Sequence, residues 1–111
     1  MPKRKRKQNQ RKTPKAAQPE ASPRSFAPVF EPEFKQDLRW WGERNRATFD
    51  KVLALVEAVL DGDPFTGKGK PEPLKFLGAG IWSRRITLEH RLVYRIEGNT
   101  VYFLQARYHY A

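Results

Sequence analysis

Three side chains that together can cleave RNA occur in separate segments of the second half of the chain. Glu72 lies between two prolines, Arg91 follows a histidine in a β-like segment, and His109 lies between two tyrosines near the C-terminus. Cleavage of RNA by its own 2′-hydroxyl needs a base for the hydroxyl proton, a cation for the extra negative charge on phosphorus, and an acid for the departing 5′-oxygen. A carboxylate, a guanidinium and an imidazole are one group of each kind. The three residues therefore predict metal-independent acid–base chemistry on a phosphodiester.

The segment around Glu72 also has a plainer interpretation. Pro71 has a fixed φ and Pro73 biases Glu72 towards extended backbone, so the carboxylate keeps little freedom, which suits a positioned base. The alternative is a solvated linker in which Glu72 offsets the neighbouring lysines Lys68, Lys70 and Lys75. The segment is not a nucleotide-binding P-loop, because it lacks the G-x-x-x-x-G-K-[ST] spacing.

The two histidines are equally open to other interpretations. His109 could stack on bases, donate a proton or pack at the end of a strand. His90 shares a strand face with apolar residues, and we interpret it as a core or turn histidine. With two histidines and no cysteine in the chain, we expect neither a metal site nor another cofactor.

Composition limits the class of protein. A chain of 111 residues forms a single domain, and its net charge of +10 indicates an anionic partner such as nucleic acid. The longest apolar run, Val52 to Leu60, is broken by Glu57 and is too short to cross a bilayer. The absence of cysteine fits a reducing compartment, and we expect a cytoplasmic protein.

Charge is distributed unevenly along the chain. Residues 1–25 carry nine Lys and Arg against Glu20 alone, a net charge of +8, and all fourteen aromatic residues lie after them. We expect a disordered basic arm over residues 1–25 and a folded domain over residues 26–111. Residues 31–63 have a net charge of −3 and residues 64–111 of +5, so the basic surface is expected on the second half.

The hydrophobic pattern predicts an α+β domain of order β-α-α-β-β-β-β. A short strand over residues 27–30 precedes two amphipathic helices, the first marked by an apolar stripe of Phe34, Leu38 and Trp41. Four segments rich in β-branched and aromatic residues then form an antiparallel meander over residues 74–77, 81–87, 90–96 and 100–108. A two-helix hairpin on one face of a small antiparallel-rich sheet hides the single apolar side of each layer.

The other face of the sheet is expected to face water or a ligand. The second half supplies five arginines for a basic face suited to a phosphate backbone: Arg84, Arg85, Arg91, Arg95 and Arg107. A two-residue and a three-residue turn would give opposite registers, so the faces of Arg85 and Arg91 cannot be fixed from the sequence. The alternative for these two arginines is exposure to solvent at the strand edges.

Four motifs in order resemble the YoeB/Txe toxins, a branch of the RelE-like mRNA interferases. They are GKGKPEPLK at residues 67–75, WSRRIT at 82–87, EHRLVY at 89–94 and RYHY at 107–110. The resemblance implies a RelE-like fold and a ribosome-bound endoribonuclease that cuts mRNA in the A site, leaving a 2′,3′-cyclic phosphate and a 5′-hydroxyl. By motif position it implies that Glu72 is the general base, Arg91 the phosphate stabiliser and His109 the general acid. Substrate placement and phosphate binding would fall to Lys68, Lys70, Lys75, Arg85 and Tyr110.

The resemblance also implies partners. These are a Phd/YefM-type antitoxin and the ribosome with its mRNA. A homodimer is a separate expectation, and the short apolar runs predict no membrane partner. The alternative from another class is a non-catalytic RNA- or ribosome-binding protein of the same fold. The basic arm departs from the family pattern, and two interpretations remain: an electrostatic tether to ribosomal RNA, or an overlong assignment of the start of the gene.

Overall fold

The computed structural model describes residues 26–108 of the chain. The predicted arm at residues 1–25 and the predicted site residues His109 and Tyr110 lie outside the described residues.

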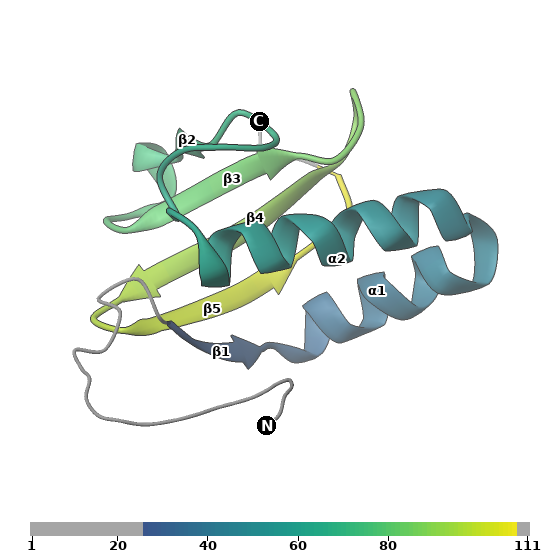
Figure 1. The fold of residues 1–111 in the computed structure, drawn as a ribbon, viewed down its shortest axis with the longest axis horizontal. Coiled ribbons are helices and arrows are strands. Elements are labelled where there is room, and N and C mark those ends of the chain that lie inside the picture. The colour runs from purple at the N-terminus through teal and green to yellow at the C-terminus, as the bar shows by residue number, and fades with distance from the viewer. Residues whose placement is uncertain (1–25, 109–111) are drawn as a thin grey trace, which may run out of the picture.

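The described residues form five strands, two α-helices and one short 3₁₀ turn (Figure 1). Their bounds are β1 Ala27–Phe30, α1 Pro32–Arg44, α2 Arg46–Asp61, β2 Glu72–Pro73, the 3₁₀ turn Lys75–Leu77, β3 Ile81–Arg85, β4 Arg91–Glu97 and β5 Thr100–Gln105. This order confirms the predicted β-α-α-β-β-β-β arrangement. No helix in the described part is long and apolar enough to cross a bilayer.

The helical hairpin follows from the apolar stripe and from one asparagine. Pro32 begins α1, where its missing N–H costs nothing, and the stripe residues Phe34 and Trp41 are buried. Asn45 ends α1 by donating its backbone N–H to the carbonyl of Trp41. The Asn45 side chain also caps α2, because its oxygen accepts the N–H of Thr48 at 3.1 Å. A single residue therefore joins the two helices and reverses the chain.

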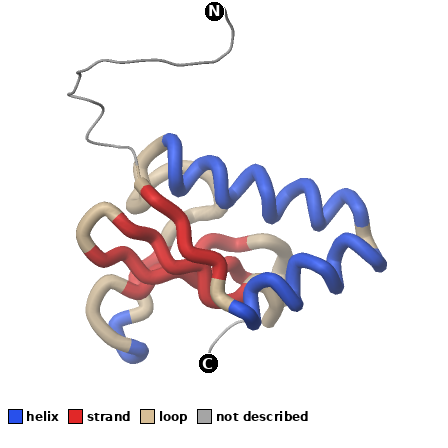
Figure 2. The backbone as a smooth tube through the Cα atoms, turned by 90° about the horizontal axis from the view of Figure 1, so that it is seen from below, coloured by secondary structure: helices blue, strands red, loops and turns tan. Residues whose placement is uncertain are grey.

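The five strands form one mixed sheet in the order β1-β5-β4-β3-β2. β1 runs parallel to β5, and the other three pairs are antiparallel. Figure 2 shows the hairpin as one layer and the sheet as the other. The short strand β2, which begins with Glu72, forms one edge of the sheet, so the predicted base lies at an edge rather than in the middle.

The core lies between the helices and the sheet. Its fully buried side chains include Val52, Leu55 and Val59 from α2 and Leu92, Tyr94 and Phe103 from the sheet. Complete burial of one large aliphatic or aromatic side chain contributes about 1.5–3 kcal/mol. The apolar contact between the layers therefore fixes which face of each strand points away from the helices.

The predicted strand over residues 74–77 is wrong in position. β2 ends at Pro73, and Lys75–Leu77 form a 3₁₀ turn in which the N–H of Leu77 donates to the carbonyl of Leu74 at 2.9 Å. Leu74 is buried while Phe76 and Leu77 are exposed, so the apolar run does not form one face of a strand. The strand pairing instead involves the proline-flanked Glu72.

Two of the five arginines predicted for the open face lie elsewhere. Arg84 is opposite the core residue Leu92, so it lies on the face towards the helices, where it is fully buried. Neighbouring residues of a strand point to opposite faces, so Arg85 lies on the other side. The guanidinium of Arg107 stacks on the ring of Trp40 in α1 at 3.9 Å. Arg85 is opposite Arg91, and Arg95 lies four residues farther along β4, an even number, so these three share the face away from the core.

Candidate active site

Strand pairing brings Glu72 and Arg91 together. Glu72 is opposite Ser83, Ser83 is opposite Val93, and Arg91 lies two residues before Val93 on the same face of β4. Nη1 of Arg91 is 3.3 Å from Oε1 of Glu72 and donates a hydrogen bond to Oγ of Ser83 at 3.1 Å. The carboxylate and the guanidinium thus meet across three strands.

This ion pair contributes little to the stability of the fold and leaves donors of Arg91 available for a ligand. The side chain of Glu72 is 58% exposed and that of Arg91 is 21% exposed. An ion pair with one exposed partner contributes little to stability. A guanidinium has five N–H donors in a fork that matches phosphate oxygens, and one of the two Nη atoms of Arg91 already holds both Glu72 and Ser83. Arg91 can therefore bind a phosphate from the open face.

The chain returns to Arg91 just before its C-terminus. The backbone N–H of Arg91 donates to the carbonyl of Tyr108 at 2.8 Å, and Tyr108 directly precedes His109 in the sequence. The described residues therefore bring two of the three predicted catalytic side chains together and carry the chain to within one residue of the third. The roles predicted for His109 and Tyr110 stay predictions.

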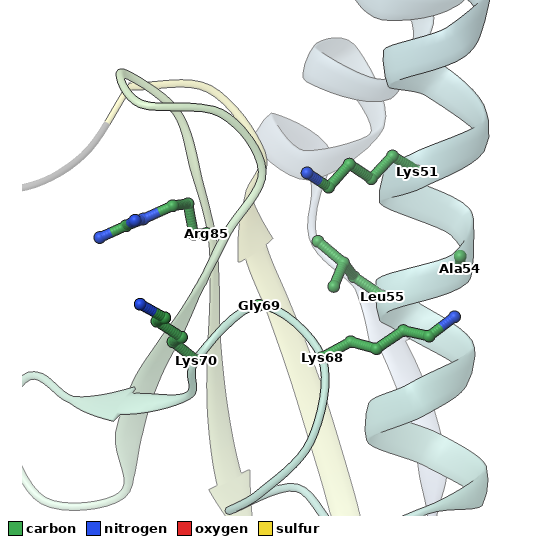
Figure 3. A pocket seen from close by; sticks show the side chains of 7 residues that line it. All are labelled: Lys51, Ala54, Leu55, Lys68, Gly69, Lys70 and Arg85. Atoms are coloured by element: carbon green, nitrogen blue, oxygen red, sulfur yellow. The ribbon is translucent and has the colours of Figure 1, made fainter.

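A cationic pocket opens beside this cluster, between α2 and the loop that precedes β2 (Figure 3). Its volume is about 410 Å³, and it is lined by Lys51, Ala54, Leu55, Lys68, Gly69, Lys70 and Arg85. Lys70 and Arg85 extend side by side, Lys51 reaches towards them from α2, and the amine of Lys68 points away from both. Within the described part of the chain, none of these four cations forms an ion pair with a carboxylate.

The pocket contains one cation that the sequence did not indicate. Lys51 precedes Leu55 by four residues, so both lie on the same face of α2. That spacing could have placed Lys51 next to the buried face, but no sequence signal says which loop packs against it. Lys75, another predicted phosphate-binding residue, is exposed at the start of the 3₁₀ turn.

Below the pocket, the buried Arg84 holds the loop. Its Nη1 donates to the carbonyl of Lys68 at 2.9 Å, and its Nη2 donates to the carbonyls of Asp63 and Thr66 at 2.7 and 2.8 Å. Its Nε donates to the hydroxyl of Tyr94 at 3.1 Å, and that hydroxyl donates to the carbonyl of Pro64 at 2.6 Å. Arg84 is therefore part of the support of the site.

The described residues include no group of three or more His, Cys, Asp or Glu side chains that could hold a metal ion.

Sequence comparison now gives the family. The family model of the YoeB-like toxin of bacterial type II toxin-antitoxin systems matches residues 30–110. The chain belongs to this family. It is 46% identical over 81 residues to Toxin YoeB of Mycobacterium bovis, which covers 73% of this chain and 94% of the relative. It is 42% identical over 82 residues to Toxin YoeB of Escherichia coli K12, covering 74% and 96%.

Solved structures agree with the RelE-like fold expected from the motifs. The YoeB/ParE toxin from Agrobacterium tumefaciens is 39% identical with a TM-score of 0.70, and the match covers 77% of this chain and all of that one. Two further structures, from Staphylococcus aureus, cover 77% of this chain and 98% of their own. One is a YoeB dimer, 32% identical with a TM-score of 0.70, and the other is a YoeB–YefM complex, 34% identical with a TM-score of 0.67.

Proposed function

We propose that this YoeB-family toxin is a ribosome-dependent endoribonuclease that cleaves mRNA in the A site. The observation that carries the proposal is the Arg91 guanidinium, 3.3 Å from the Glu72 carboxylate on an open basic face, beside the segment that leads to His109. Base, cation and acid are the three groups that 2′-hydroxyl transesterification requires.

The proposed reaction has one chemical step with a pentavalent phosphorane. The Glu72 carboxylate removes the proton of the 2′-hydroxyl, and the 2′-oxygen forms a bond to phosphorus. Arg91 balances the additional negative charge, while the bond from phosphorus to the 5′-oxygen breaks and His109 gives that oxygen a proton. The products are a 2′,3′-cyclic phosphate and a 5′-hydroxyl, and no metal or cofactor enters the balance.

Substrate placement is proposed for the cations around this cluster. Arg85 is opposite Arg91 and also lines the pocket with Lys70, so one RNA backbone can contact both places. Lys51 joins this set because it reaches towards Arg85 and Lys70 from α2. Lys68, Lys75 and Tyr110 complete the residues proposed to contact phosphate or neighbouring bases.

The proposed partners follow from the reaction and from the relatives. The ribosome presents the mRNA, which places the protein in the cytoplasm. A YefM-type antitoxin with an acidic, partly disordered segment is proposed to cover the basic face, as a YoeB from Staphylococcus aureus forms a complex with YefM. A homodimer is proposed from the dimeric YoeB of the same species.

Two substitutions test the chemistry. Glu72→Gln and His109→Gln keep the size of the side chains and remove the base and the acid. Each should lower the rate of mRNA cleavage on programmed ribosomes by about 10²–10⁴-fold, with ribosome affinity nearly unchanged. The 5′ ends of the cleaved transcripts should carry hydroxyl groups.

Undiminished cleavage by His109→Gln would remove His109 as the acid. Equal loss of cleavage and of ribosome binding in Glu72→Gln would indicate a structural role for Glu72. Expression without antitoxin separates the enzyme from a non-catalytic RNA-binding protein of the same fold. Growth arrest that disappears in both variants supports the enzyme, whereas arrest that persists in both supports the binder.

A further inference from the structure

The segment after β5 is held through its backbone by side chains of α1. The N–H of Ala106 donates to Oδ2 of Asp37 at 2.9 Å, and Nε1 of Trp41 donates to the carbonyl of Ala106 at 2.8 Å. All three residues are buried. An unpaired buried N–H or carbonyl costs about 1–3 kcal/mol, so these bonds fix the path of the chain as it leaves the sheet.

Two residues farther along, Tyr108 is held by the connection between β3 and β4. Its N–H donates to Nδ1 of His90 at 2.7 Å, and its carbonyl accepts the N–H of Arg91 at 2.8 Å. Tyr108 has a φ of +61°, a left-handed conformation that is uncommon for residues other than glycine and persists where the surroundings hold it. Both backbone polar groups of Tyr108 are thus engaged by two consecutive residues, of which the second is the predicted phosphate stabiliser.

The ring of His90 is itself fixed. It packs edge-on against Trp41 with the ring centres 4.9 Å apart and the planes at 89°. The backbone N–H of His90 donates to Oγ1 of Thr87, and its carbonyl accepts the N–H groups of Ile86 and Thr87. Because Nδ1 accepts a hydrogen bond, the proton of the neutral ring is on Nε2. His90 is therefore a turn histidine, as the sequence suggested, and its one ring acceptor is used by the backbone of Tyr108, which directly precedes His109.

We propose that His90 is a positioning residue of the cleavage reaction. Through Nδ1 it holds Tyr108 against Arg91, and so it sets the point from which the last residues of the chain leave the fold. The inference rests on the proposed function, because it matters for cleavage only if His109 is the acid. It gives His90 no contact with RNA. A displacement of a catalytic group by about 1 Å can cost about 10²-fold in rate, so loss of this one bond should affect the chemical step.

The matched pair His90→Asn and His90→Leu tests this role in the full-length chain. Asn and Leu have nearly the same shape, but only Asn has an acceptor at the position of Nδ1. On programmed ribosomes, His90→Leu should lower the single-turnover cleavage rate by about 10–100-fold with ribosome affinity within about twofold. His90→Asn should stay within about threefold of the parent rate. If His90→Leu proves unstable on thermal unfolding, His90→Gln replaces it, since its acceptor lies one bond too far out and the same loss is expected.

A second measurement does not depend on RNA cleavage. Amide exchange of Tyr108, followed by NMR on the isolated toxin, should be at least about tenfold faster in His90→Leu than in the parent and in His90→Asn. Absence of cleavage by the parent protein would reject the proposed function, and the exchange rates would still decide whether His90 anchors Tyr108.

Three outcomes would overturn the proposal. A parental cleavage rate in His90→Leu would show that the anchor is not needed. Equal losses in the Asn and Leu variants would make the imidazole itself a reacting group instead of a positioning one. Unchanged Tyr108 exchange in His90→Leu would show that the hydrogen bond to Nδ1 does not hold the chain.

Discussion

At the scale of single residues, the arginines of β3 and β4 in this toxin are of two kinds: those that lie on the open face and one that is buried and supports a loop. Arg91 is partly exposed and shares its guanidinium between Ser83 and Glu72 on the open face. Arg84 is fully buried and makes four hydrogen bonds, three of them to backbone carbonyls of the loop before β2. A buried guanidinium is tolerated only when its donors are satisfied. Arg84 therefore uses its hydrogen-bond donors to hold the loop that carries Lys68 and Lys70.

The sequence singled out Arg91 as a candidate site residue, but it did not predict that Arg84 is buried. Glu72 and Arg91 were recognisable because their types fit one reaction and the proline-flanked position of Glu72 is unusual. Arg84 was misplaced because it has the same type as its neighbour Arg85, and alternation fixes their relative faces without saying which one is inside. The satisfied carbonyls that make the buried position possible come from residues 63–68, and nothing local in the sequence announces that contact.

Tyr94, whose hydroxyl accepts a hydrogen bond from Arg84, predicts how the free energy of unfolding depends on pH. Burial raises the pKa of the Tyr94 hydroxyl above its usual 10.0, and the hydrogen bond from Arg84 offsets part of that rise. Above about pH 10, the unfolded chain loses this proton while the folded protein keeps it. The folded state then binds more protons, so the free energy of unfolding must fall as pH rises through this range.

Urea unfolding of the parent and of Tyr94→Phe checks this. At neutral pH the variant should be less stable by about 1–3 kcal/mol, because the carbonyl of Pro64 and Nε of Arg84 lose their partner. This deficit should shrink between about pH 9 and pH 11, since the variant has no proton to keep there. A deficit that stays constant over this range would contradict the burial argument.

At the scale of elements, the loop between α2 and β2 forms no helix or strand, yet hydrogen bonds and close contacts hold its backbone. Gly69 has a φ of +82°, and its carbonyl accepts the N–H of Arg85 at 2.7 Å. A Cβ atom added to Gly69 would lie 3.0 Å from Cβ of Arg84, 3.1 Å from Cδ2 of Leu55 and 3.2 Å from the carbonyl oxygen of Arg85. The loop thus lies directly on both α2 and β3.

Gly69→Ala should consequently cost at least about 2 kcal/mol of stability, from the left-handed backbone and from the close contacts together. Gly98→Ala is the matched control, because Gly98 also has a positive φ, +59°, but an added Cβ would meet nothing within 4 Å. The control should cost about 1 kcal/mol. Chemical denaturation of both variants gives the comparison, and equal losses would mean that the loop is not packed as described.

Elements with long periodic patterns were predictable, whereas of the short elements the strand over residues 27–30 was predicted correctly and the strand over residues 74–77 was not. The stripe of Phe34, Leu38 and Trp41 defined α1, and the predicted element order is confirmed. The prediction for residues 74–77 failed because three apolar residues and one lysine fit a strand or a turn equally well. Leu74 fixes how this segment pairs with β3, because its side chain is buried and its backbone N–H donates to the carbonyl of Ile81. That is a tertiary contact with no local signature.

At the scale of the whole molecule, the net charge changes sign along the chain: the helical part is acidic, and the segments before and after it are basic. Residues 31–63, which include both helices, carry −3, while residues 64–111 carry +5 and residues 1–25 carry +8. The family model begins at residue 30, so the most basic part of the chain lies outside the match. The sequence predicted this segregation fully, because it depends on counts alone. It did not decide whether residues 1–25 take part in function.

Deletion of residues 1–25 separates the two interpretations of that segment. The fold should remain, since the first described strand begins at Ala27 and its N–H is bonded to the carbonyl of Asn99 at 2.8 Å. We expect the free energy of unfolding to change by less than about 0.5 kcal/mol. If the segment contacts ribosomal RNA, the association constant should fall and its dependence on salt should flatten, because each phosphate contact adds about 0.7–0.9 to the slope.

A full-length variant with residues 3–7 changed to Gln is the control for length. It removes five of the nine positive charges of residues 1–25 and keeps every residue position. An electrostatic tether requires the salt slope of this variant to lie between those of the parent and the deletion, since counterion release scales with the number of phosphates neutralised. Slopes that coincide in all three proteins would assign ribosome binding to residues 26–111 alone. In that case the basic face around Arg85 and Arg91 would have to supply the electrostatic attraction by itself.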